Sequence, residues 1–197
     1  MDKNTKNSLL FGAAVGGLFA LLRGAKEKAS LTDTQRKDLG AATKSFDSLK
    51  TSLDKNVQLA PIYAIIKEKE AVKDYDAILS YLGDQISQSR EDSSEVENFN
   101  DRLEYILSSR FTSDRANPKT HEIQSFFLPL KRFPSLARDL FSKRIAILTL
   151  IQKAFMYIKA AEVSDFKPDD KQLLQSLVSE FQILQKEMTN QLARLSK

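Results

Sequence analysis

The chain has 197 residues, of which 42% are hydrophobic and 28% charged, and its formal net charge is +4 at pH 7. This composition is typical of a folded chain rather than a disordered one, and the length allows one domain plus a terminal segment. The lack of cysteine excludes disulfides, thiolate metal sites and a cysteine nucleophile, while the low content of glycine and proline (6 and 5 residues) favours long helices.

The first element is an apolar run from Leu9 to Leu22 without a single polar side chain. As a helix it would rise about 21 Å, against a bilayer hydrocarbon core of about 30 Å. It lacks the charged stripe of a helix that lies on a membrane surface, and no small-residue cleavage site of a secretory signal follows it. We therefore predict that residues 1–28 form a glycine-rich membrane-anchor helix with a basic flank. A helix buried in the folded domain and a re-entrant segment are the alternatives.

Small residues crowd this run. Gly12 and Gly16 have the G-x-x-x-G spacing that lets two helices approach closely in lipid. Gly12, Gly16 and Gly17 are therefore the predicted helix-packing residues. Slightly more basic residues follow the run than precede it, which predicts a single-pass protein of the cell membrane with the bulk of the chain in the cytoplasm.

The segment from Gly12 to Ala20, followed after two residues by Arg23-Gly24-Ala25-Lys26-Glu27, resembles the start of YtxH-like proteins. Those are small bacterial membrane-anchored proteins with a glycine-rich hydrophobic segment, a basic turn and a long helical tail. The chain departs from that pattern at Leu21-Leu22, where the family usually has Pro-Lys. The resemblance implies a bacterial helical protein that is membrane-associated or stress-related, and it supplies no catalytic residues.

From residue 29 onward, apolar residues recur with helical spacing. Ser30 and Thr32 are candidate N-caps, with Asp33 and Gln35 at capping-box positions. The helix that follows has an apolar seam with alternating spacings of three and four, as in a coiled coil or an amphipathic bundle helix: Leu39, Ala42, Phe46, Leu49, Leu53, Asn56 and Ala60.

Three further elements are predicted in the middle of the chain. Asp74 is the expected N-cap of a helix. The polar run 88–94 is predicted to be a loop, and Ser94 with Glu97 a capping box that opens the next helix. Pro134 is expected to start the longest apolar helix, at the centre of a bundle. A second membrane span there is disfavoured, because Arg144 and Lys153 bound its apolar part too closely.

The last helix is predicted to begin at Pro168, with Asp169 and Asp170 near the positive end of the helix dipole. It carries the most regular apolar seam of the chain. This seam is the predicted face for partner binding or self-association and consists of Leu174, Leu177, Phe181, Leu184 and Met188.

The region 110–153 has an excess of basic residues interleaved with phenylalanines. Contact with anionic lipid is one interpretation, and phosphate contact with nucleic acid is the less favoured one. The third is that the aromatic residues form core and the basic residues the solvated helix faces. The predicted anionic-surface contact consists of Lys131, Arg132, Arg138, Lys143 and Arg144.

The sequence contains no recognisable enzyme or cofactor motif. His121 is the only histidine, and there is no H-E-x-x-H, G-x-S-x-G or P-loop pattern. Carboxylates are numerous but spread over polar faces, so their spacing assigns no acid–base pair. We therefore expect a non-enzymatic protein without a cofactor.

Together these features predict an all-α fold: an N-terminal hydrophobic helix (1–28) followed by an antiparallel helical bundle (29–197) with coiled-coil-like seams. The expected function is that of a membrane-anchored scaffold or interaction protein facing the cytoplasm. Its expected partners are membrane lipid and a protein partner or a second copy of the chain. Two alternatives stay open: a membrane-active (pore-forming or lysis-type) protein that oligomerises through the glycine-rich helix, and a soluble helical adaptor whose first helix is buried.

Overall fold

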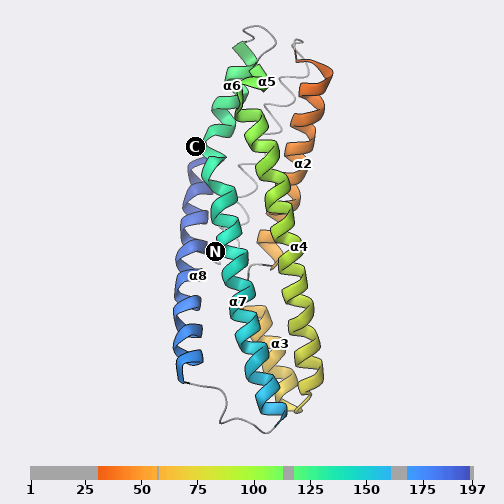
Figure 1. Cartoon of the computed structure of the whole chain (residues 1–197), viewed down its shortest axis with the longest axis vertical. Helices are drawn as coiled ribbons and strands as arrows, with labels where there is room; N and C mark the ends of the chain where they lie inside the picture. Colours follow the sequence, from red (N-terminus) through yellow and green to blue (C-terminus); the bar gives the residue numbers. More distant parts are fainter. Residues whose placement is uncertain (1–30, 57, 113–117, 161–167, 196–197) are drawn as a thin grey trace, which may run out of the picture. The chain divides into compact units, whose positions relative to one another are not determined.

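The computed structural model describes residues 31–56, 58–112, 118–160 and 168–195, and every regular element in these ranges is helical (Figure 1). The predicted all-α class is therefore confirmed for these ranges. The N-terminal hydrophobic helix predicted within 1–28 lies outside the described residues. The elements are α2 (Asp33–Asn56), α3 (Ala60–Ala71), α4 (Tyr75–Leu107), α5 (Ser109–Thr112), α6 (Pro118–Phe127), the 3-10 helix η1 (Leu128–Arg132), α7 (Phe133–Lys159) and α8 (Pro168–Leu195).

The described residues divide into two compact units. Unit 1 consists of residues 31–51, 94–112, 118–137 and 186–195. Unit 2 consists of residues 52–56, 58–93, 138–160 and 168–185. The segment that the sequence analysis treated as one bundle thus supplies two units, and the long helices contribute residues to both.

Helix α2 begins with the predicted capping box. The backbone N–H of Thr32 donates to Oε1 of Gln35 at 2.9 Å, and the N–H of Gln35 donates to Oγ1 of Thr32 at 3.2 Å. The buried Gln35 side chain also donates from Nε2 to the backbone carbonyl of Phe111, at 2.6 Å. One glutamine therefore both caps α2 and fixes it against α5 within unit 1.

The core of unit 1 is aromatic. Phe46, Phe99 and Phe133 come from α2, α4 and α7, all three are buried, and their ring centroids lie 5.3, 5.6 and 6.2 Å apart. Tilted and edge-to-face pairs at such distances are favourable beyond the area they bury. The predicted seam of α2 is confirmed by the burial of its apolar residues from position 39 to 53, whereas Ala60 is exposed at the start of α3.

The C-terminal end of α4 is capped by a side chain from α6. Nε2 of Gln124 donates to the backbone carbonyls of Ile106 and Ser108, at 2.9 and 3.0 Å. The last carbonyls of a helix lack partners within the helix. The Gln124 amide therefore provides hydrogen bonds for two carbonyls at the end of α4.

Helix α4 is unbroken from Tyr75 to Leu107 (Figure 1), so the predicted loop at 88–94 and the capping box at Ser94 were wrong. Positions 82, 85, 89, 92, 96 and 99 keep the alternating spacing of three and four, which carries the inner face of the helix through the polar stretch. The Ser89 hydroxyl donates to the carbonyl of Gln85 at 2.7 Å. This bond satisfies a serine in a helix interior, where the residue is otherwise unfavourable.

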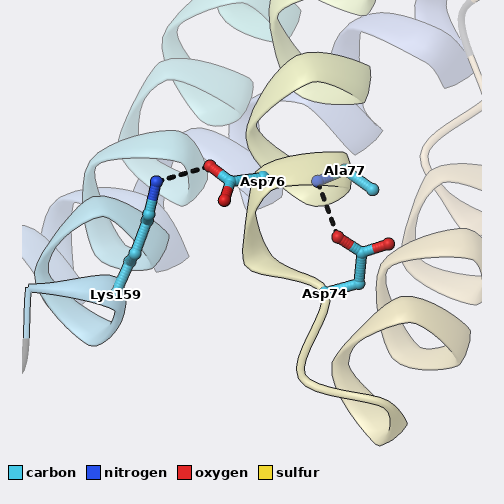
Figure 2. A network of polar contacts seen from close by, with 4 residues as sticks. All are labelled: Asp74, Asp76, Ala77 and Lys159. Carbon is cyan, nitrogen blue, oxygen red and sulfur yellow. Dashed lines mark hydrogen bonds and ion pairs between the residues drawn. The ribbon is translucent and has the colours of Figure 1, made fainter.

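In unit 2, a tight turn joins α3 to α4. Lys73 in this turn has a φ of 57°, the left-handed conformation. Asp74 is the N-cap of α4, as predicted, because its Oδ1 accepts the N–H of Ala77 at 3.1 Å (Figure 2). Two residues after this N-cap, Asp76 of α4 forms an ion pair with Lys159 of α7 (Figure 2). The start of α4 is thereby held beside the end of α7.

The single-pass membrane location expected from the sequence is corrected here. Within the described ranges, no helix is long and apolar enough to cross a membrane. The long helices carry charged side chains at intervals too short to leave the roughly 20 consecutive apolar residues that a span requires. The apolar run 9–22, on which the expectation was based, lies outside the described residues.

Candidate functional site

Helices α7 and α8 pair within unit 2 and contain the predicted binding seam. Two ion pairs join them, one between Lys143 and Glu180 and one between Lys153 and Asp170, the latter at 2.8 Å. Residue numbers rise along α8 as they fall along α7, so the two helices are antiparallel. The pairs fix α8 to α7 at two points, ten residues apart on each helix.

The predicted seam of α8 faces the chain's own core where its side chains are described. Leu177 and Phe181 are buried, and Leu184 is half-buried. The side chains of Leu174 and Met188 lie outside the described residues. The buried members of the seam therefore stabilise unit 2 and are not free to bind a partner.

Two large aliphatic side chains of α8 outside this buried seam are exposed. Leu173 is 50% exposed and Ile183 is 65% exposed, and the exposed residues between them are polar. We call Leu173, Ile183 and the intervening exposed residues Ser176 and Glu180 the outer α8 face. Both side chains leave half or more of their surface in solvent, so this face is the candidate interaction site.

The two α7–α8 ion pairs shift the pKa values of exposed groups. The hydrogen bond from Lys143, aided by one from Ser176, lowers the pKa of Glu180 below its usual value. The hydrogen bond to Asp170 raises the pKa of Lys153. Both shifts favour the charged forms, so both pairs are intact at neutral pH. Solvent screening keeps the contribution of such exposed pairs to stability small.

The five basic residues of the predicted anionic-surface contact have different environments. Lys131, Arg132 and Arg138 are exposed. Lys143 is half-buried and forms an ion pair with Glu180 of α8. Arg144 is 1% exposed, so its assignment to a surface contact was wrong. The phenylalanines of this region whose burial the structure describes, at positions 111, 127, 133 and 141, are buried, which supports the interpretation that they form core.

Arg144 lies at the centre of a buried polar cluster between α4 and α7. Its Nη2 donates to Oε1 of Gln85 at 2.8 Å, and its Nη1 donates to the Gln85 carbonyl at 3.2 Å and to the hydroxyl of Ser89. Ser89 is 0% exposed and Asp92 2% exposed. The Asp92 carboxylate accepts a hydrogen bond from Gln88 at 3.2 Å. We call Arg144, Gln85, Ser89 and Asp92 the Arg144 cluster.

The cluster contains a buried charge and its counter-charge. Burial lowers the pKa of Arg144, and the charges of Asp92 and, to a smaller extent, Tyr81 oppose that change. Burial raises the pKa of Tyr81, against the opposing effect of Arg144. Because an arginine stays protonated in proteins, Asp92 is the group that balances the buried cation. Nε of Arg144 has no hydrogen-bond partner among the described residues.

The α4 members of the cluster were missed because a run of polar residues is typical of a loop. Gln85, Ser89 and Asp92 continue the spacing of the apolar residues Leu82 and Val96 on the same helix. That unbroken spacing is the pattern that identifies them. It indicates a helix whose core face contains polar groups.

The hydrogen bonds of Arg144 join α7 to α4 and so can position the two helices. A guanidinium that donates to an amide, a carbonyl and a hydroxyl is neither a nucleophile nor a general base. Across the ranges that the structure describes, no group of three or more His, Asp or Glu side chains is placed to hold a metal ion. His121 is exposed on α6.

The predicted helix-packing glycines, Gly12, Gly16 and Gly17, lie outside the described residues. Comparison of the chain with protein-family models, with curated proteins and with solved structures gives no match. The resemblance to YtxH-like proteins, carried by residues 12–27, therefore stays a prediction.

Proposed function

We propose that this protein is a non-enzymatic helical interaction protein that self-associates through the outer α8 face. The observation that carries the proposal is the exposure of Leu173 and Ile183 on a helix whose inner stripe, at Leu177 and Phe181, is already buried. The buried stripe has the four-residue spacing of a bundle seam. Helix α8 thus packs against its own unit through one stripe and leaves aliphatic side chains exposed beside that stripe.

The outer α8 face is complementary to a second copy of itself. Leu173 and Ile183 lie about 15 Å apart along the helix axis and within about 80° of each other around it. In an antiparallel pair of α8 helices related by a twofold axis, Leu173 of each copy faces Ile183 of the other. Such an isologous contact uses one surface twice and closes the assembly as a dimer.

The charge at the centre of this face does not oppose the pairing. Glu180 lies between the two aliphatic residues, and Lys143 of the same chain already balances its charge. Asp169 and Glu187 lie on the same side of α8 and would face each other across the twofold axis, which weakens the contact. The aliphatic area is small, and full burial of one Leu or Ile side chain contributes only about 1.5–3 kcal/mol. We expect a weak dimer whose population rises with protein concentration.

Sedimentation equilibrium of the full chain over a range of concentrations tests this proposal. The wild-type chain should show a reversible monomer–dimer equilibrium, and L173D/I183D should weaken it at least about tenfold, because two charges replace the contact. The matched control is Q172D/Q182D, which adds the same charge at exposed neighbouring positions of the same helix; it should dimerise like the wild type. A chain that is monomeric at every concentration, or equal weakening by both variants, would overturn the proposal.

A further inference from the structure

We propose that the Arg144 cluster selects the register in which α7 packs against α4 in unit 2. The apolar residues of these helix faces repeat at similar spacings, so sliding one helix past the other exchanges one aliphatic contact for another. A buried polar group at a single seam position removes this freedom, because only one register gives it partners. Arg144 is such a group.

Several contacts mark the register of the antiparallel pair. Lys159 pairs with Asp76 at one end, and Nε2 of Gln152 donates to the Leu79 carbonyl at 3.3 Å in the middle. Arg144 reaches Gln85 and Ser89 further along α4. The first contact is exposed and the second is a long single hydrogen bond, so neither gives a strong preference. The Arg144 contacts are buried and multiple.

A slip of seven residues separates Arg144 from these partners in either direction. Toward the start of α4, the guanidinium would lie against the buried aliphatic residues Ile78 and Leu82, which accept no hydrogen bond. Toward the end of α4, it would lie against Asp92 and Val96, where it would keep the Asp92 carboxylate but lose the three acceptors of Gln85 and Ser89. A buried cation without acceptors is strongly unfavourable, which disfavours the slip toward the start of α4. The slip toward the end is disfavoured less strongly, because Arg144 exchanges three hydrogen bonds for contact with Asp92 alone.

The contacts of the Arg144 cluster indicate that it selects one helix register more than it increases the stability of unit 2. Nε of Arg144 lacks a partner among the residues the structure describes, and an unsatisfied buried donor is costly. Apolar residues of similar volume often fill such sites with equal or better stability. What an apolar filling does not supply is a preference for one register.

Cross-linking between engineered cysteines measures the register, because the natural chain contains no cysteine. Position 83 lies beside Gln152, since a Cβ built on Gly83 is 3.7 Å from Nε2 of Gln152. In the full chain, G83C/Q152C therefore reports the native register. R90C/Q152C and D76C/Q152C report a slip of seven residues to either side. A short bifunctional thiol reagent should join the native pair alone.

The test measures these three cysteine pairs in the wild-type chain and in a variant, R144M/S89A/D92L, whose cluster residues are replaced by apolar ones. We call this variant the apolar background. The slipped pairs should cross-link there at least about tenfold faster than in the wild-type background, as expected when the penalty for a buried unpaired charge is removed. R138M, the same replacement at an exposed position of α7, is the matched control and should keep the native pair alone. If the apolar background also joins only the native pair, the proposal is overturned.

A second variant decides the case if circular dichroism shows that the apolar background is unfolded. R144K keeps the charge but loses the planar fork that reaches Gln85 and Ser89 together. Slipped cross-links should then appear at a level between those of the wild type and of unfolded chains. Native cross-links alone in R144K would overturn the proposal.

Discussion

Arg144 of α7 donates a hydrogen bond to the hydroxyl of Ser89 of α4 where both side chains are buried. The neighbouring residues of the two helix faces, such as Leu82 and Leu148, are apolar and equally buried. The buried polar contacts of Arg144 thus interrupt apolar packing between the two helices. It gives unit 2 a feature that can be tested separately from its apolar packing.

Replacing Arg144 by alanine is expected to lower the free energy of unfolding by about 3–5 kcal/mol, because Asp92 then stays buried without its cation. Urea denaturation at neutral pH measures the change. The double variant R144A/D92A should regain part of the loss, because neither charge is then left unbalanced. A loss below about 1 kcal/mol for R144A, within the range of an ordinary hydrogen bond, would show that the buried charge is not balanced by Asp92.

Replacing Gln35 by alanine should destabilise unit 1 by about 2 kcal/mol, because it removes half of a capping box and leaves the Phe111 carbonyl without this donor. Thermal unfolding followed by circular dichroism provides the measurement. Thr34→Ala, at an exposed position of the same helix turn, is the control and should change stability by no more than about 0.5 kcal/mol. Equal effects of the two substitutions would argue against the double role of Gln35.

Substitutions of Phe46, in the aromatic core of unit 1, should lower stability more as the cavity they leave becomes larger. Phe46→Ala is expected to cost about 3–5 kcal/mol, because it opens a cavity against Phe99 and Phe133. Phe46→Leu should cost less, since it leaves a smaller cavity. The exposed Leu128 provides a comparison, because its replacement by alanine should be nearly neutral. Denaturant midpoints of the three variants measure the order, and a neutral Phe46→Ala would contradict this packing.

The α7–α8 ion pairs predict how stability depends on pH. The pKa of Glu180 is lowered in the folded state, so its contribution is present above the usual glutamate pKa of about 4.3 and is lost as pH falls through the lower folded value. The pKa of Lys153 is raised. Its contribution is therefore present below the usual lysine pKa of about 10.4 and is lost as pH rises through the higher folded value. Both contributions are present between these limits.

Melting temperatures across this pH range test the assignment at low salt, where exposed pairs are least screened. Glu180→Gln should reduce the acid-side change and leave the alkaline side as in the wild type. Asp170→Asn, which removes the partner of Lys153, should reduce the alkaline-side change. An acid-side profile of Glu180→Gln identical to that of the wild type would contradict the role assigned to the Lys143–Glu180 pair.

Local patterns were the most predictable part of the molecule. The capping box at Thr32 and the N-cap at Asp74 depend on residues three positions apart, so the sequence alone identifies them. The apolar seam of α2 and the start of α8 at Pro168 follow from spacing and helix-start preferences in the same way. Each of these features depends only on residues that lie close to one another in the sequence.

Features that depend on distant residues were not predictable in this way. The polar stretch of α4 resembles a loop until Arg144, more than fifty residues later, supplies the donors for Gln85 and Ser89. Arg144 in turn resembles a surface residue, because arginines are seldom buried without partners. The seam of α8 predicted the correct inner residues, but spacing alone did not separate a face that closes the unit from a face that binds a partner.

The central claim is that two copies of the chain pair through antiparallel α8 helices, and mixed cross-linking tests it most directly. One sample carries L173C and the other I183C, in a chain otherwise free of cysteine. After mixing, a short thiol reagent should join position 173 of one copy to position 183 of the other, while each sample alone should give little product. Cross-links that form as readily within each sample alone, or no cross-link in the mixture, would contradict the claim.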